Sequence, residues 1–305
     1  RHERYSADRI SFSGSGLKYN KGKTLPEEYP LDHITLDNIG FDAGELFLDN
    51  KCISATISGL TMKQPGGLNI TDASARFTSN ADTLQLHKLD IISKNGSSVH
   101  GHFIIPRQTL LIPINKRFKA ELDVIVDKRD LTKLVTPEVY KKLNCFENRM
   151  LKAELALSGN VHNISIDTLS MKFPGIGTMN ISGNVKNALK KNRINGNLNL
   201  KGHIENIGRI IDYDNYCDSV DGKISVNGDI RYNSGDVSMQ LAVRAANGNI
   251  NANGRYNFID TTYKANIDVE KWSLSGILPQ IPLDNLSMSI NAKGKGVEIF
   301  NNVTA

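Results

Sequence analysis

Apolar and polar residues alternate with a period of two over much of this chain. Clear examples are the segments 116–127, 151–159, 236–245 and 261–270, which read "KRFKAELDVIVD", "LKAELALSG", "DVSMQLAVRA" and "TTYKANIDVE". Successive side chains of an extended strand point to opposite faces of a sheet, so each segment has one apolar and one polar face. The pattern predicts an all-β protein built from antiparallel strands.

Asparagine–glycine and aspartate–glycine pairs are frequent between and within these segments. Such pairs favour two-residue hairpin turns, so the sequence predicts turns at Asn95-Gly96, Asn195-Gly196, Asp221-Gly222, Asn227-Gly228, Asn247-Gly248 and Asn253-Gly254. Several of the glycines also fit the interior of a bulged strand, because Gly159, Gly202 and Gly228 lie inside alternating runs. Both interpretations stay open at this stage.

Short helices are predicted at three places, 130–143, 206–212 and 273–278. In the first, Asp130 is a candidate N-cap, and Thr136 is a second cap with Pro137 at the first helical position. The apolar residues have the spacing of one helix face and are expected to pack on the sheet: Leu131, Leu134, Val135, Tyr140 and Leu143.

The strand and helix pattern repeats along the chain. The candidate caps Asp130, Asn206 and Ser273 are separated by roughly seventy residues, a period typical of repeat architectures. The segments "LALSGNVHNI" (155–164) and "LNLKGHIENI" (198–207) share apolar residues, glycine, asparagine and isoleucine at the same offsets. We therefore expect one continuous architecture, with a strand-rich part at 1–126 and further repeats at 127–305.

An apolar sheet face must be covered, either by folding the sheet on itself or by a ligand or partner. Because the predicted helices are short and large aromatic residues are few, we expect an elongated, curved antiparallel sheet, and both a packed interior and an open apolar groove stay possible. Medium-sized side chains of this kind suit acyl chains at least as well as a rigid core. The residues predicted to line the groove are Leu155, Leu157, Leu198, Leu200, Ile224, Val226, Met239, Leu241, Ile267, Val269, Met288 and Ile290.

Composition and charge exclude few functions. The chain has 305 residues and a net charge of +5, but its cations are dispersed, so no basic stripe predicts nucleic-acid binding. Cys52, Cys145 and Cys217 are too far apart in sequence for a typical metal or disulfide motif, and their role stays open. The chain begins and ends within its pattern, so we expect it to be part of a longer protein.

Motifs for catalysis, metals and nucleotides are weak. The "GKT" at 22–24 lacks the glycine that a phosphate-binding loop needs at position 17. His100 and His102 share one strand face but have no third ligand nearby in sequence, so solvent-facing histidines are expected. The acidic stretch 212–221 departs from a calcium loop. We expect no enzyme activity and no cofactor; the alternative is an enzyme, a β-solenoid that acts on polysaccharide.

Three segments resemble the TamB branch of the AsmA-like envelope proteins. Residues 122–185 contain a strand, an Asp-Leu short helix and a strand that runs into "LALSGNV"; residues 31–77 are similar to upstream repeats, and "LSMSINAKGKG" (286–296) is similar to a terminal strand. The resemblance covers most of residues 31–296 and rests on apolar spacing.

The resemblance implies a periplasmic protein, anchored in the inner membrane, whose β-groove shields phospholipid acyl chains on their way to the outer membrane. It also implies a BamA-like outer-membrane partner, contacted through regions outside these residues. Two alternatives remain open: a structural or adhesive repeat with a packed core, and an assembly factor for outer-membrane proteins that conducts no lipid.

Overall fold

The structure is a computed structural model, and it forms two units, Arg1–Ser158 and Gly159–Ala305, which are described separately below. The boundary between the two units lies inside one strand. The division between residues 126 and 127, which the repeats suggest, stays a prediction. The residues that the structure describes are 4–20, 30–49, 52–106, 117–142, 150–160, 162–188, 193–206, 221–246, 248–273 and 285–296.

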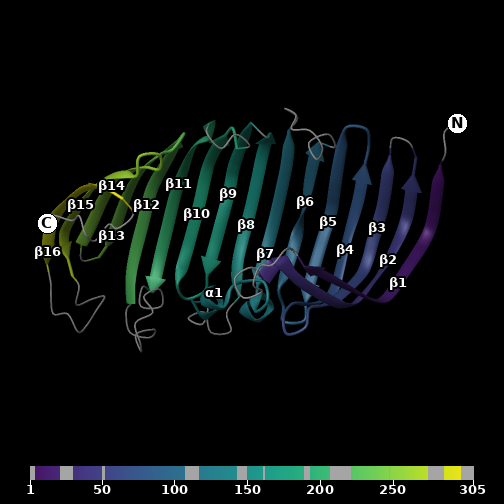
Figure 1. The fold of residues 1–305 in the computed structure, drawn as a ribbon. Coiled ribbons are helices and arrows are strands. Elements are labelled where there is room, and N and C mark those ends of the chain that lie inside the picture. Colours follow the sequence, from purple (N-terminus) through teal and green to yellow (C-terminus); the bar gives the residue numbers. More distant parts are fainter. Residues whose placement is uncertain are drawn as a thin grey trace. The chain divides into compact units, whose positions relative to one another are not determined.

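Nearly all described elements are strands, drawn in chain order in Figure 1. The first unit contains β1 (Tyr5–Asn20), β2 (His33–Leu48), β3 (Ile53–Lys63), β4 (Asn69–Ser79), β5 (Thr83–Ser93), β6 (Ser98–Pro106) and β7 (Phe118–Val126). The strand β8 (Leu151–Asn160) contains the unit boundary. The second unit continues with β9 (Asn163–Phe173), β10 (Gly177–Lys186), β11 (Asn195–Asn206), β12 (Asp221–Asn233), β13 (Asp236–Ala245), β14 (Gly248–Asn257), β15 (Thr262–Trp272) and β16 (Leu286–Lys295).

Each strand is hydrogen-bonded to the strands that precede and follow it in sequence, which gives one 16-stranded sheet in the order β1 to β16. The strand pairs with a described register are antiparallel. The predicted all-β antiparallel sheet is therefore confirmed. The only described helices are short: η1 (Pro30–Asp32), η3 (Lys128–Leu131) and α1 (Pro137–Lys142).

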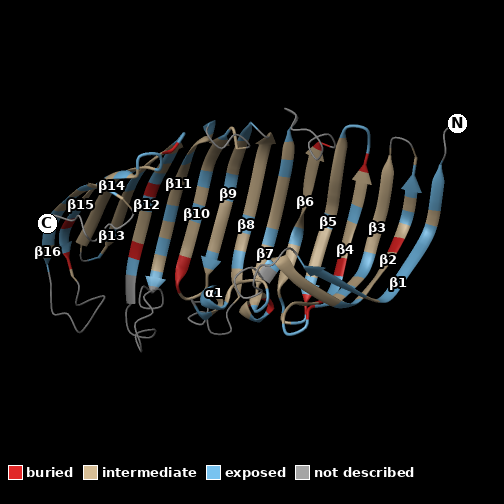
Figure 2. Cartoon of the chain, viewed as in Figure 1, coloured by how far each residue is buried: buried red, intermediate tan, exposed pale blue. Residues whose placement is uncertain are grey.

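Few described side chains are fully buried, as Figure 2 shows by its scattered red segments. In the first unit the buried apolar residues include Ala43, Ile70 and Ala73 on β2 and β4. The rings of Phe12 and Phe41, which are opposite each other on β1 and β2, stack with centroids 5.3 Å apart. The two rings therefore pack against each other across the first two strands.

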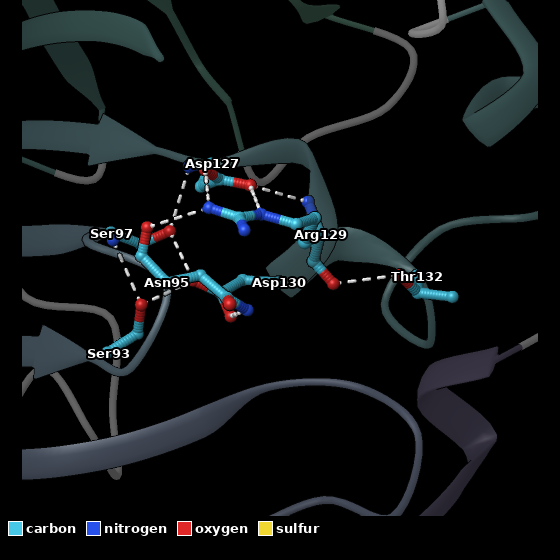
Figure 3. A network of polar contacts seen from close by, with 7 residues as sticks. All are labelled: Ser93, Asn95, Ser97, Asp127, Arg129, Asp130 and Thr132. Atoms are coloured by element: carbon cyan, nitrogen blue, oxygen red, sulfur yellow. Dashed lines mark hydrogen bonds and ion pairs between the residues drawn. The ribbon is translucent and has the colours of Figure 1, made fainter. Parts of the chain in front are cut away.

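A buried polar network fixes the segment after β7 to the hairpin between β5 and β6 (Figure 3). Asp130 is 2% exposed; its carboxylate accepts hydrogen bonds from Ser93 Oγ, from Asn95 Nδ2 at 2.7 Å and from Ser97 Oγ at 2.6 Å. The network therefore joins residues that are more than thirty positions apart in sequence.

The prediction that Asp130 caps a helix is wrong. The N-cap of η3 is Asp127, whose side chain accepts a hydrogen bond from the backbone N–H of Arg129 at 2.9 Å. Asp130 instead lies inside η3, buried against the hairpin. The second cap is as expected: α1 begins at Pro137, and the Thr136 Oγ1 accepts from the Val139 N–H at 3.4 Å.

The helix predicted at 130–143 is interrupted, because turn residues separate η3 from α1. Its apolar stripe is half-buried at Leu131, Leu134, Val135 and Tyr140. Leu143 lies outside the described residues, and so do the helices predicted after Asn206 and Ser273. Of the cysteines, Cys52 is a half-buried free thiol, while Cys145 and Cys217 lie outside the described residues.

In the second unit the buried apolar residues Ile224, Val269 and Trp272 form one cluster. Ile224 is on β12 and the other two are on β15, with two strands between them. In a flat sheet those strands would be about 14 Å apart, given a spacing of 4.7–4.9 Å. The sheet of this unit therefore bends toward its apolar face near these residues.

Most of the predicted asparagine–glycine turns are wrong. Asn95-Gly96 forms the expected turn, with Gly96 at φ +93°. The predicted turns that lie inside strands instead are Asn195-Gly196, Asp221-Gly222, Asn227-Gly228 and Asn253-Gly254, while Asn247 lies outside the described residues. These glycines follow the alternation of their strands, so they take a place on a sheet face. The alternative interpretation places Gly228 inside a bulged strand. Gly228 does lie inside a strand, but β12 has no bulge there, because it keeps a continuous register with both neighbours.

Candidate functional site

The candidate site is the face of β11 to β16 that carries their apolar side chains, the apolar face. Residues directly opposite each other in neighbouring strands point to the same face of a sheet, so the pairing register decides which side chains share it. One row of opposite residues crosses all six strands: Leu200, Gly228, Leu241, Ala252, Ile267 and Ile290.

Two parallel rows extend this face toward the ends of the strands. One contains Val226, Val243, Ile250, Val269 and Met288; the other contains Leu198, Ile230, Met239, Gly254, Ala265 and Ala292. A further row joins Ile204, Ile224, Ala245 and Gly248. The structure therefore brings ten of the twelve predicted groove residues onto one face.

The remaining two predicted residues, Leu155 and Leu157, are half-buried on β8. They belong to the other unit, and the described pairs do not connect them to the rows above. Their membership of the same face stays a prediction.

Among the described residues of this unit, no second layer covers the apolar face, because all described regular elements after β8 belong to the sheet itself. Met239 is 38% exposed and Met288 is 42% exposed, while Ile224 is 2% exposed within the cluster. The face is therefore most tightly packed at the Ile224 row and most accessible at its methionines.

A glycine makes room for a large side chain near the centre of the face. Gly228 lies between Leu200 and Leu241, and a Cβ added there would be 3.2 Å from Leu241 Cδ1. The leucine thus leans over the glycine and lies close to the backbone of β12. Leu241 therefore occupies the space that a side chain at position 228 would need.

Sequence reasoning missed several residues of this face, among them Ile204, Ile250 and Trp272. The first two lie in alternating runs and could have been found by extending the pattern. Trp272 could not, because the register shifts between Val269 and Trp272, where Lys271 has a φ of +49°. The bulge returns the indole to the apolar face out of step with the alternation.

The reverse face of the same strands is polar. Its hydrogen bonds run between neighbouring strands: Asn199 Nδ2 donates to Asp229 Oδ1 at 3.0 Å, and Ser289 Oγ donates to Asp268 Oδ1 at 2.6 Å. Arg255 pairs with Asp236 at 3.2 Å, and hydrogen bonding from Arg255 holds the pKa of the Asp236 carboxyl below its ordinary value. The sheet of this unit is therefore strongly amphipathic.

The described residues contain no group of three metal-binding side chains. His100 and His102 are on β6, and each approaches a carboxylate, with His100 Nδ1 3.1 Å from Asp90 Oδ1 and His102 Nε2 3.5 Å from Glu121 Oε2. His100 is exposed, as the sequence predicted, whereas His102 is half-buried; their pairing with carboxylates was not predicted.

Comparison of the chain with protein-family models, with curated proteins and with solved structures found no match. In the part of the chain that the structure describes, no helix has the length and hydropathy needed to span a membrane.

Proposed function

We propose that this chain shields phospholipid acyl chains on its apolar face, as part of a periplasmic lipid-transport bridge between the inner and outer membranes. The observation that supports this most is the row from Leu200 to Ile290, which continues through six adjacent strands on one face. The periplasmic location, the inner-membrane anchor and a BamA-like partner rest on the resemblance to TamB alone.

Elementary energetics explain why such a face would be useful. Each methylene moved into water costs about 0.8 kcal/mol, so a sixteen-carbon chain faces a barrier on the order of ten kcal/mol. A continuous strip of Leu, Ile, Val and Met side chains lowers that barrier while the head group stays in water. No nucleophile or proton transfer is needed for this process.

Photo-crosslinking in cells tests the proposal directly. A photoreactive amino acid at Leu241 or Ile267, on the apolar face, should capture phospholipid. The matched controls are Ala242 and Asp268, which are the adjacent residues on the polar face of the same strands. Equal capture at both faces, or capture at neither, contradicts lipid shielding on this face.

A packed structural repeat is the second candidate, favoured by the cluster of Ile224, Val269 and Trp272. If that cluster extends over the whole face in the longer protein, the strip is a core and binds nothing. Native mass spectrometry with gentle release separates the two functions, because co-purified phospholipid supports shielding and a bare polypeptide mass supports the structural repeat.

A further inference from the structure

The polar face of the second unit has a depression of about 330 Å³ over β12 to β15. Its lining includes Arg231, Arg255 and Lys264, with Asp229 as the only carboxylate. These residues lie on the side of the sheet opposite the apolar face, because their neighbours Ile230, Gly254 and Ala265 belong to that face. The charged and amide side chains of the depression therefore lie on the polar face, although Met239 and Gly254, which belong to the apolar face, also border it.

Cations line up across the strands at this depression. Arg255 is directly opposite Lys264, and Lys264 is directly opposite Lys293; Arg231 is in the same row, separated from Arg255 only by Ser238. Like charges directly opposite each other destabilise a sheet. Such a row is unfavourable for folding alone, and an anion would relieve the repulsion.

Most of these cations have no anionic partner in the described structure. Arg255 is paired with Asp236, but among the residues that the structure describes Arg231, Lys264 and Lys293 make no ion pair or side-chain hydrogen bond. All three are exposed. Their charged groups are therefore available to a ligand.

A row of amides runs beside the cations. Gln240, Asn253 and Asn266 line the depression and are opposite one another on β13, β14 and β15. An amide both donates and accepts hydrogen bonds, which matches the hydroxyl groups of a sugar. The lining contains no aromatic side chain, and stacking on such side chains is a main source of single-stranded nucleic-acid binding.

We propose that this depression binds a phosphorylated saccharide, with its phosphate on the cation row of Arg231, Arg255 and Lys264 and its hydroxyl groups on the amide row. The phosphate supplies the charge that the cation row lacks, and the amides distinguish a sugar phosphate from free phosphate. The same chemistry occurs in free sugar phosphates and in the head groups of glycolipids such as lipid A.

The test uses the 305-residue chain and calorimetric titration with trehalose 6-phosphate. Trehalose and inorganic phosphate should each bind more weakly, because each lacks one half of the recognised chemistry. Arg231→Gln/Lys264→Gln should weaken binding by about tenfold or more, the loss expected for removed charge-assisted hydrogen bonds. Gln240→Ala should weaken trehalose 6-phosphate and leave inorganic phosphate unchanged.

The matched control is Lys186→Gln/Lys201→Gln, which removes two exposed cations outside the depression. It should bind as the wild type does, and circular dichroism should show the same fold for every variant. A second arm measures binding to phosphatidylcholine vesicles with and without lipid A. If the chain binds lipid A vesicles and not the free sugar phosphate, and this binding is again lost in Arg231→Gln/Lys264→Gln, the result supports the site and shows that its ligand is a lipid head group.

Three results would overturn the proposal: binding of neither probe, equal losses in the two double variants, or tighter binding of a single-stranded oligonucleotide than of trehalose 6-phosphate. None of them bears on photo-crosslinking at Leu241. The failure of this site is therefore distinguishable from the failure of lipid shielding.

Discussion

At the scale of residues, buried carboxylates determine how the segment after β7 attaches to the sheet. Asp127 and Asp130 are 1% and 2% exposed, and they accept hydrogen bonds in different ways. Asp127 pairs with Arg129, whereas Asp130 accepts three neutral side-chain donors. Burying a carboxylate is costly unless it is hydrogen-bonded in this manner, so these contacts are specific requirements of the fold.

Asp130→Asn should destabilise the chain by about 2 kcal/mol, because the new amide brings N–H donors against Ser93, Asn95 or Ser97 and leaves buried groups unsatisfied. Thermal unfolding followed by circular dichroism measures the loss. Asp72→Asn is the control, because Asp72 is exposed on β4 of the same unit, and it should stay within about 0.5 kcal/mol of the wild type. Equal stability of the two variants would contradict the role given to Asp130.

The pair formed by Asp127 and Arg129 predicts how stability changes in acid. Hydrogen bonding from Arg129 lowers the pKa of Asp127 below its ordinary value, which is about 3.9 in an unfolded chain. The stabilisation is therefore fully present above the unfolded pKa and is lost as the pH falls through the folded pKa. Urea unfolding between pH 5 and pH 2, in steps of about 0.5 pH unit, should show a smaller decline in stability for Asp127→Asn than for the wild type. An unchanged decline would contradict the prediction.

At the scale of elements, the sequence predicted strands well and their connections poorly. Alternation in β13 and β15 identified the apolar residues correctly. In an antiparallel strand with one polar and one apolar face, the two kinds of residue alternate along the sequence. The turn predicted at Asn227-Gly228 was wrong, because the same pair of residues is compatible with two structures. One is a hairpin turn, and the other is a strand in which the glycine makes room for Leu241. Local chemistry does not distinguish these cases, since the choice depends on the neighbouring strands.

The bulge in β15 and the long-range contacts of Asp130 could not be predicted from the sequence either. The alternation of β15 gave no sign that Lys271 would adopt a positive φ and bring Trp272 onto the apolar face. The role of Asp130 depends on a hairpin more than thirty residues earlier, so the local pattern suggested only a cap. The apolar face itself was predictable, while its packing at Ile224 was not.

The apolar stripe of the segment from η3 to α1 leads to a prediction at this scale. Leu134 is half-buried, whereas Val139 on α1 is 46% exposed. Leu134→Asp should destabilise the chain by about 1–3 kcal/mol, because it places a charge at a partly buried apolar position. Val139→Asp should have little effect in the same thermal unfolding experiment. Equal melting temperatures would show that Leu134 contributes no packing.

At the scale of the whole molecule, the two faces of the second unit have different chemistry and independent proposed roles. The apolar face is a continuous strip with no described cover, and the polar face combines an amide row with a cation row. A sheet with both faces available can bind an apolar chain on one side and a polar anion on the other. Substitutions on adjacent residues of one strand can therefore separate the two activities.

Leu241→Asp should block acyl-chain passage along the apolar face, because a chain crossing the central row would meet an unpaired charge. Ala242→Asp is the matched control: it introduces the same carboxylate one residue away, on the polar face and outside the lining of the depression. Circular dichroism must first show that both proteins are folded, since Leu241 is half-buried near Gly228. In cells that depend on this protein, we expect Leu241→Asp to impair the outer-membrane barrier, measured as sensitivity to detergent and large antibiotics, and Ala242→Asp to preserve it. If folded Leu241→Asp protein supports the barrier as well as the wild type does, the central row carries no lipid, and the strip of apolar residues has a structural role.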